Sequence, residues 1–270
     1  MKSIIVDDLL EVSGSIKLAV RARIAEKTSS PTILFIHGFG CAKETFVNAF
    51  TSPSLVNFDL IAFDLPGHGQ SSKSEDFTYS MRDMARCTLE ILEKLGISNF
   101  HLCVHSMVGI IGIELVERTP ARVRSFMNLE GNPTLDDCFF TNKIIEYSYQ
   151  NFVATGRKLI EEELSRLALG DPSIISYLET FKKTSSSALY YAALDTVKIS
   201  GDSKLISRFM QLKKSCYVYG ERNKGKFPAE EKLLSLGVPV YYIANAGHFM
   251  IVDNPVELYK LVEKWVMARI

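Results

Sequence analysis

The feature that most constrains this chain is the alternation of short apolar runs with helical periodicity across its first half. Four runs have the length and composition of strands buried on both faces: residues 32–36, 60–63, 100–104 and 126–129. Between the second and third runs, apolar residues recur at three- and four-residue steps over 81–95, with Ser80 and Gly96 suited to cap that helix. Strands that alternate with helices predict parallel βαβ units, and therefore an α/β fold with a mostly parallel sheet flanked by helices.

The alternation stops at about residue 133. From there to residue 212 the pattern predicts successive helices without a strand, and the segment is rich in Phe and Tyr. Strand patterns resume at 216–219 and 238–243, and a last helix is expected to start at Asn254 and to run through Trp265. The simplest organisation is one α/β core, residues 1–132 and 213–270, with an inserted helical cap at 133–212 that we expect to form a mobile lid.

Charge and hydropathy narrow the range of partners. The 31 basic and 31 acidic side chains cancel, which argues against a nucleic-acid binder because phosphate affinity needs an excess of Lys and Arg. No apolar run approaches the roughly 20 residues that span a bilayer. Residues 1–8 turn acidic before the apolar stretch of a signal peptide could form. We therefore expect a small-molecule partner, with neither nucleic acid nor membrane, and the sequence makes no prediction of oligomeric state.

The cysteines and the missing cofactor motifs are equally informative. The five cysteines are odd in number and never spaced as C-x-x-C, which indicates reduced thiols and a cytoplasmic location. The histidines are scattered without a metal-ligand spacing, and neither glycine-rich nucleotide motif occurs. No metal and no cofactor are expected.

Polar motifs follow the predicted strands at the points where each strand ends. They are His37-Gly38-Phe39-Gly40, the segment 64–71, His105-Ser106-Met107-Val108-Gly109 and Ala246-Gly247-His248-Phe249. The carboxyl ends of parallel strands meet at one edge of a sheet, where ligand sites form. In their order these motifs resemble the α/β-hydrolase family over nearly the whole chain.

The resemblance implies that Ser106 is the nucleophile on a strand–turn–helix elbow and that His248 is its general base. A serine at such a junction can also be a simple helix N-cap, and a loop histidine can simply bond to backbone. The elbow departs from the family's G-x-S-x-G because Val104 and Val108 replace its glycines. The helix is then expected to sit farther from the strand unless Gly109 relieves the crowding.

The acid of the triad is the least determined member. Asn223 occupies the position where the family usually has an aspartate, and an amide cannot supply the negative charge. Glu130, at the end of the strand after the nucleophile helix, is the favoured acid, since some α/β-hydrolases place theirs there. Glu221 is the alternative, and Asn223 itself is retained as an orienting residue.

The resemblance also implies an oxyanion hole built from the backbone N–H groups of Phe39 and Met107. Gly38 and Gly40 let the first of these loops turn, although a glycine pair is also found in ordinary turns. His37 is expected to brace that loop, and His105 to pack beside the elbow.

A serine nucleophile selects among the family's chemistries. Haloalkane dehalogenases and epoxide hydrolases use aspartate at the elbow, so Ser106 favours acyl transfer to water. We expect a carboxylesterase-like serine hydrolase that cleaves a small, largely apolar carboxylic ester through an acyl-enzyme. A C–C bond hydrolase with the same triad is the nearest alternative, and Met107 argues against a prolyl aminopeptidase. A catalytically inactive ligand-binding homologue is the alternative from another class.

Overall fold

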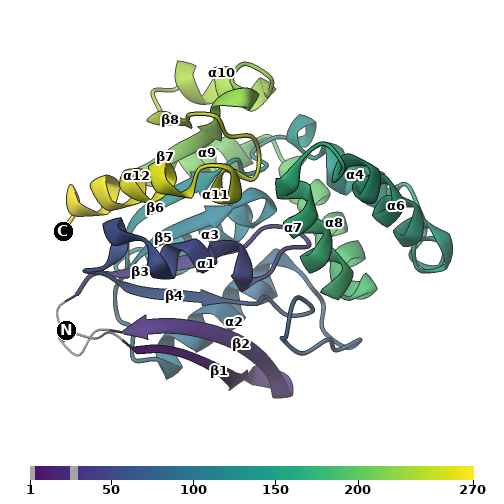
Figure 1. Cartoon of the computed structure of the whole chain (residues 1–270), viewed down its shortest axis with the longest axis horizontal. Helices are drawn as coiled ribbons and strands as arrows, with labels where there is room; N and C mark the ends of the chain where they lie inside the picture. The colour runs from purple at the N-terminus through teal and green to yellow at the C-terminus, as the bar shows by residue number, and fades with distance from the viewer. Residues whose placement is uncertain (1–3, 25–29) are drawn as a thin grey trace.

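The structure is a computed structural model that describes residues 4–24 and 30–270 (Figure 1). Among these residues an eight-stranded sheet has the order β1-β2-β4-β3-β5-β6-β7-β8. Its strands are β1 (Ile4–Val12), β2 (Ile16–Ile24), β3 (Thr32–Ile36), β4 (Asp59–Phe63), β5 (Phe100–His105), β6 (Val123–Leu129), β7 (Ser215–Gly220) and β8 (Val240–Ile243). β1, β2 and β4 pair antiparallel, and every pairing from β4 to β8 is parallel. The predicted mostly parallel α/β sheet is confirmed.

The strands predicted to be buried on both faces form the centre of the sheet. Every residue of β3, β4 and β5 is buried, as expected for runs covered by helices on both sides. The last strand is shorter than predicted, because β8 begins at Val240 and not at residue 238.

The hairpin of β1 and β2 is absent from the sequence-based expectations. β2 is mostly buried, with Leu18, Ala19 and Val20 buried in succession and Lys17 exposed. β1 exposes Ile5 and Leu9 at the edge of the sheet, so it lacks the buried run that marked the other strands. Residues 1–3 of the N-terminal segment, in which no signal peptide is predicted, lie outside the described residues.

Helices cover both faces of the sheet (Figure 1). α2 and α3 pack into the apolar cluster on one face, and α1 and α12 into the cluster on the other. The bounds are α1 (Val47–Thr51), α2 (Met81–Lys94), α3 (Gly109–Arg118), α10 (Pro228–Ser235), α11 (Met250–Asp253) and α12 (Pro255–Met267). The predicted caps are confirmed: the Ser80 hydroxyl accepts from Asp83 N, Gly96 has a φ of +68°, and the Asn254 side chain accepts from Glu257 N.

Between β6 and β7 the chain contains helices and no strand, within residues 133–212 that the structure describes throughout. The helices are α4 (Phe139–Ile145), α5 (Tyr149–Asn151), α6 (Arg157–Leu167), α7 (Pro172–Lys183), α8 (Ser186–Ser200) and α9 (Lys204–Gln211). In Figure 1, α4, α6, α7 and α8 gather beside one end of the sheet. α9 differs, because its Phe209 ring packs against Phe126 of β6 and Tyr217 of β7, with centroids 5.6 and 6.1 Å apart. The cap limits 133–212 remain a prediction. Within them, α9 packs against the sheet.

Candidate active site

Ser106 stands on a strained turn between β5 and α3. Its φ of +61° lies in the left-handed region that residues with a side chain avoid. The backbone is held there because the buried strand β5 ends at the preceding residue and α3 starts only three residues later. This geometry lifts the Ser106 side chain out of the sheet and leaves it partly exposed.

Glycines next to the turn provide the close packing that Val104 and Val108 cannot. A Cβ on Gly109 would lie 2.7 Å from the Asn128 side chain, and one on Gly112 would lie 2.5 Å from the Phe126 ring. α3 therefore approaches β6 through these two glycines. Both valines are fully buried beside them.

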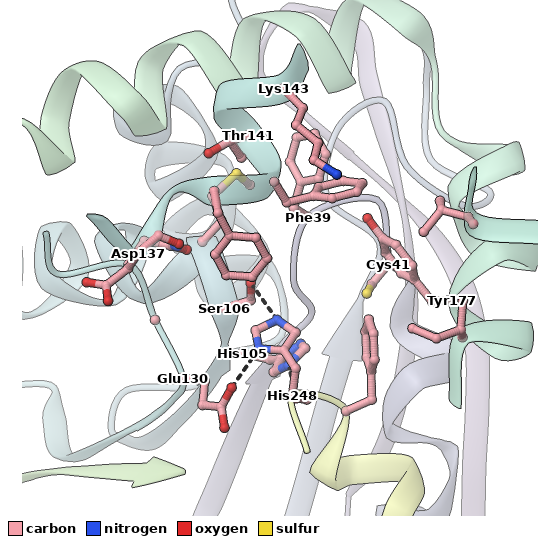
Figure 2. Close-up of a pocket in the computed structure, with 18 of the residues that line it drawn as sticks. Phe39, Cys41, His105, Ser106, Glu130, Asp137, Thr141, Lys143, Tyr177 and His248 are labelled. Atoms are coloured by element: carbon pink, nitrogen blue, oxygen red, sulfur yellow. Dashed lines mark hydrogen bonds and ion pairs between the residues drawn. The ribbon is translucent and has the colours of Figure 1, made fainter. Parts of the chain in front are cut away.

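Three side chains from separate loops form one hydrogen-bonded chain (Figure 2). The Ser106 hydroxyl lies 3.1 Å from His248 Nε2, and His248 Nδ1 lies 2.8 Å from Glu130 Oε2. A carboxylate can only accept, so His248 donates from Nδ1 and its Nε2 is the atom that accepts the Ser106 proton. The structure thus brings together the three residues predicted to be nucleophile, base and acid.

The Glu130 carboxylate is buried, and two groups besides His248 donate hydrogen bonds to it. Gly220 N donates to Oε1 at 2.7 Å, and Asn223 Nδ2 reaches Oε1 at 3.1 Å and Oε2 at 2.9 Å. Asn223 therefore contacts the acid and not the histidine. Glu221 is exposed and accepts from Asn245 N at 3.2 Å, so the structure does not bring it to His248.

The loop after β3 lies against the elbow. A Cβ on Gly38 would be 3.0 Å from Ser106 Cβ, and Gly40 has a φ of +65°, so both positions need glycine. His37 donates from Nδ1 to Gly38 O at 2.9 Å and accepts from Leu65 N at 3.0 Å, which joins this loop to the end of β4. Burial lowers the pKa of His37 to about 4, so it is neutral and serves as the predicted brace.

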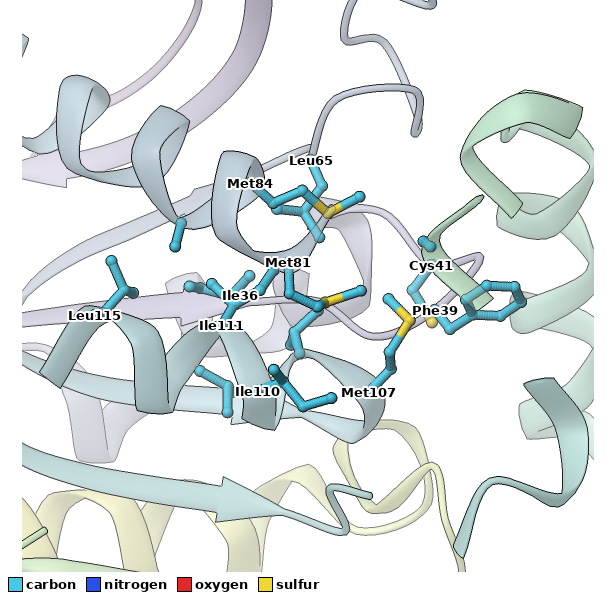
Figure 3. Close-up of a cluster of buried hydrophobic side chains, with 14 of the residues drawn as sticks. Ile36, Phe39, Cys41, Leu65, Met81, Met84, Met107, Ile110, Ile111 and Leu115 are labelled. Carbon is cyan, nitrogen blue, oxygen red and sulfur yellow. The ribbon is translucent and has the colours of Figure 1, made fainter. Parts of the chain in front are cut away.

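Phe39 and Met107 anchor the two backbone segments expected to donate to an oxyanion. Their side chains lie in an apolar cluster with Ile36, Met81 and Ile110 (Figure 3). A buried side chain fixes the backbone that carries it, and both residues also line the cavity at Ser106. Their role in an oxyanion hole stays a prediction.

A cavity of about 270 Å³ opens onto Ser106 and His248. Its wall is mostly apolar and draws on α4, α6 and α7 as well as on the sheet. The apolar and aromatic residues are Phe39, Met107, Phe139, Phe140, Leu164, Leu167, Ile174, Tyr177, Tyr219, Phe227 and Phe249. Figure 2 shows Tyr177 and Cys41 on one side of this space and Asp137 on the other.

Sequence reasoning missed Asp137 as a member of the cavity wall. The residue is buried, and burial raises the pKa of its carboxyl group to about 6. Its Oδ2 accepts from Thr134 N and Oγ1, a capping box that the spacing Thr134-x-x-Asp137 already signals. Its Oδ1 has no hydrogen-bond partner among the described residues.

Comparison with known families agrees with the fold. A family model described as "alpha/beta hydrolase fold" matches residues 31–173. The chain therefore belongs to the α/β-hydrolase family, and the expectation of an α/β-hydrolase enzyme is confirmed.

Among curated proteins, an uncharacterized hydrolase of Saccharomyces cerevisiae is 30% identical over 148 residues, 53% of this chain and 49% of that protein. A dihydrolipoyllysine-residue acetyltransferase component of Cupriavidus necator is 36% identical over 108 residues, 39% of this chain and 28% of that protein. The chain thus spans less than half the length of either relative.

Solved structures resemble the chain over nearly its whole length. An N-acyl homoserine lactonase mutant complexed with N-hexanoyl homoserine has a TM-score of 0.77 at 22% identity, covering 98% of both chains. A thermophilic esterase from Thermogutta terrifontis has a TM-score of 0.77 at 18% identity, covering 98% of this chain and 99% of the other. At such identities the likeness shows the fold.

Two further findings concern membrane spans and cysteines. No helix in residues 4–24 and 30–270 is long and apolar enough to span a bilayer. All five cysteines are free and buried.

Proposed function

We propose that this protein is a serine hydrolase that cleaves a small, largely apolar carboxylic ester through an acyl-enzyme. The observation that carries the proposal is the hydrogen-bonded chain from Ser106 through His248 to Glu130, open to an apolar cavity. A hydroxyl is a weak nucleophile at neutral pH, and this arrangement supplies the base that activates it.

The geometry supports the following steps. His248 Nε2 takes the Ser106 proton as Oγ attacks the ester carbonyl, and the negative charge on Glu130 stabilises the imidazolium that forms. The oxyanion of the tetrahedral intermediate accepts from Phe39 N–H and Met107 N–H. His248 then protonates the leaving alcohol, and water repeats the sequence to release the acid.

The cavity supports a small substrate. Its volume of about 270 Å³ lies just below the ~300–1,000 Å³ of most small-molecule pockets. Rings from Phe140 and Tyr177 and the side chain of Leu164 offer contacts to an acyl chain. Among the fold relatives are a carboxylesterase of Nitrososphaera gargenis and the Thermogutta terrifontis esterase, in line with an ester substrate.

Labelling with a fluorophosphonate probe tests the proposal. We expect rapid labelling of the protein and none of the Ser106→Ala variant, since only an activated serine reacts quickly. An unreactive native protein would favour the inactive ligand-binding homologue. A labelled protein that hydrolyses no p-nitrophenyl ester from acetate to octanoate would favour the C–C bond hydrolase, which uses the same triad.

The cytoplasmic location and the lack of a nucleic-acid partner remain predictions from charge and cysteine content. The division into a core and a cap at 133–212 is part of the same proposal. Its support is that α4, α6 and α7 line the cavity that contains Ser106.

A further inference from the structure

His105, the last residue of β5, contacts the main chain of the base. Its Nε2 lies 2.8 Å from the backbone oxygen of His248, and the two imidazole rings have centroids 4.7 Å apart. Figure 2 shows the His105 ring directly beside His248. The residue next to the nucleophile in sequence is thus bonded to the residue that activates it.

The hydrogen bond from His105 holds the backbone carbonyl of His248, which no other hydrogen bond among the described residues holds. Arg222 N donates to Ala246 O at 2.9 Å and Gly247 N donates to Asp253 Oδ2 at 2.8 Å, both before His248. After it, Val252 N and Asp253 N donate to Phe249 O at 2.8 and 2.9 Å, so the carbonyl of His248 itself is the group that these contacts leave free. The His248 ring is held at its two nitrogens. Its own carbonyl is held by His105, and because carbonyl and side chain leave the same Cα, fixing one restricts the direction of the other.

The protonation state of His105 suits this contact. A carbonyl only accepts, so His105 carries its proton on Nε2. Burial and the neighbouring His248 lower the pKa of His105 well below its usual value, so the ring stays neutral. Its Nδ1 faces Gly38, where a Cβ would lie 2.8 Å away, and has no hydrogen-bond partner among the described residues. A neutral neighbour does not repel the imidazolium that His248 becomes during catalysis.

We propose that His105 is a positioning residue: its Nε2–H bond to the His248 carbonyl holds the base in register with Ser106. This rests on the proposed roles of Ser106 and His248. Misplacing a catalytic group by about 1 Å can cost ~10²-fold in rate, so a single main-chain bond can have a large effect.

A matched pair of variants isolates the bond. The side chains of His105→Gln and His105→Met have nearly the same shape, but only Gln keeps a terminal N–H that can reach the carbonyl. We expect the Gln variant to remain within about tenfold of the native kcat on a p-nitrophenyl ester. The Met variant should lose a further 10- to 100-fold in kcat, with KM unchanged in both.

His101→Met is the control for loss of a buried imidazole in the same strand. His101 is buried in β5 and bonds to Ser125 Oγ at 2.8 Å, away from His248. We expect this variant to lower the thermal midpoint while leaving kcat within about twofold. An equal loss of kcat in His101→Met and His105→Met would overturn the proposal, since it would show a general effect of strand destabilisation.

Hydrogen exchange over residues 244–250 gives a readout independent of catalysis. We expect faster exchange in His105→Met than in His105→Gln, because only the first frees the loop. Equal exchange and equal kcat in the pair would refute the positioning role even if Ser106 labels normally. A native protein that fails to label while the pair differ in exchange would refute the proposed function and leave the His105 contact intact.

Discussion

Two buried carboxylates in this protein have opposite surroundings. Glu130, at the carboxyl edge of the sheet, accepts from Gly220, Asn223 and His248. Asp137, in the helical segment, accepts from Thr134 through one oxygen, while its other oxygen has no partner among the described residues. The sheet edge therefore compensates a buried charge, whereas the helical segment leaves one carboxylate oxygen without a donor.

The difference reflects how each region is built. The ends of β5, β6 and β7 are fixed relative to one another by backbone hydrogen bonds, so donors from β7 and the loop after it can converge on the Glu130 carboxylate. The helices α4, α6 and α7 line the cavity, and α4 packs on α7 through side chains such as Phe140 against Tyr177 and Phe181. Under the proposed function, the chemistry takes place at the sheet edge and the helices set substrate preference, and the following variants test that separation.

The largest effect is expected from Ser106→Ala. Ester hydrolysis should fall by ~10⁴-fold or more, because removal of a triad member removes the reaction path that it serves. The fold should be unaffected, with a thermal midpoint at or above that of the native protein, since only the hydroxyl is lost. Hydrolysis within about tenfold of the native rate would contradict the nucleophile assignment.

Glu130→Gln should lower kcat by roughly 10²–10⁴-fold, because an amide cannot stabilise the His248 imidazolium. Glu221→Gln is the matched control at the exposed carboxylate and should be nearly silent. Steady-state kinetics on one ester, with circular dichroism to verify folding, compares the two. A silent Glu130→Gln beside an impaired Glu221→Gln would reverse the assignment of the acid.

Asn223→Asp should be harmful although it restores the residue usual in the family. The new carboxylate would lie where Asn223 Nδ2 now donates to both Glu130 oxygens, 3.1 and 2.9 Å away. Two such groups share a proton and weaken the negative charge beside His248, so we expect kcat at pH 7 to fall by roughly 10- to 100-fold.

Asn223→Ala removes the same donors without adding a charge, and we expect its kcat to fall by less than about tenfold. Kinetics of the two variants at pH 6 and pH 8 separate the effects. A gain in kcat for Asn223→Asp would contradict the expected sharing of a proton between the two carboxyl groups.

These contacts mark the limit of the sequence analysis. The sheet, its central strands and the helix caps follow from local patterns. The order of motifs at strand ends led, through the family resemblance, to Ser106 and His248, and the same resemblance favoured Glu130 over Glu221 as the acid. The bond from Asn223 to Glu130 depends on the register of β6 against β7, which no short motif encodes. The cavity wall depends on how α4, α6 and α7 pack, and helical periodicity does not determine that. The β1–β2 hairpin was missed because its first strand is exposed.

Within the cap, Leu164→Ala should change selectivity more than chemistry. Leu164 is buried on α6 and lines the cavity, so its truncation makes room for a longer acyl chain. We expect the ratio of kcat/KM for p-nitrophenyl octanoate to that for the acetate to rise by roughly tenfold. Fluorophosphonate labelling should stay within about threefold of the native rate. Equal changes in both esters and in labelling would indicate that the sheet edge and the cap are not separable.

The smallest effect on chemistry and a distinct effect on stability are expected from Asp137→Asn. Burial raises the pKa of Asp137 from 3.8 to about 6, so the folded protein binds a proton between these values that the unfolded chain releases. The contribution of this carboxyl to stability is therefore greatest below pH 3.8 and is lost as the pH rises through about 6. At ~1.4 kcal/mol per pKa unit, the loss of stability by pH 7 is at most about 3 kcal/mol.

Asn is uncharged throughout and can still accept from Thr134, so the stability of the variant relative to the native protein should increase between pH 4 and pH 7. Urea unfolding at both pH values measures the difference. If the difference in free energy of unfolding between the variant and the native protein were the same at both pH values, burial would not disfavour the charged form of Asp137. The contrast between Asp137 and Glu130 would then be wrong.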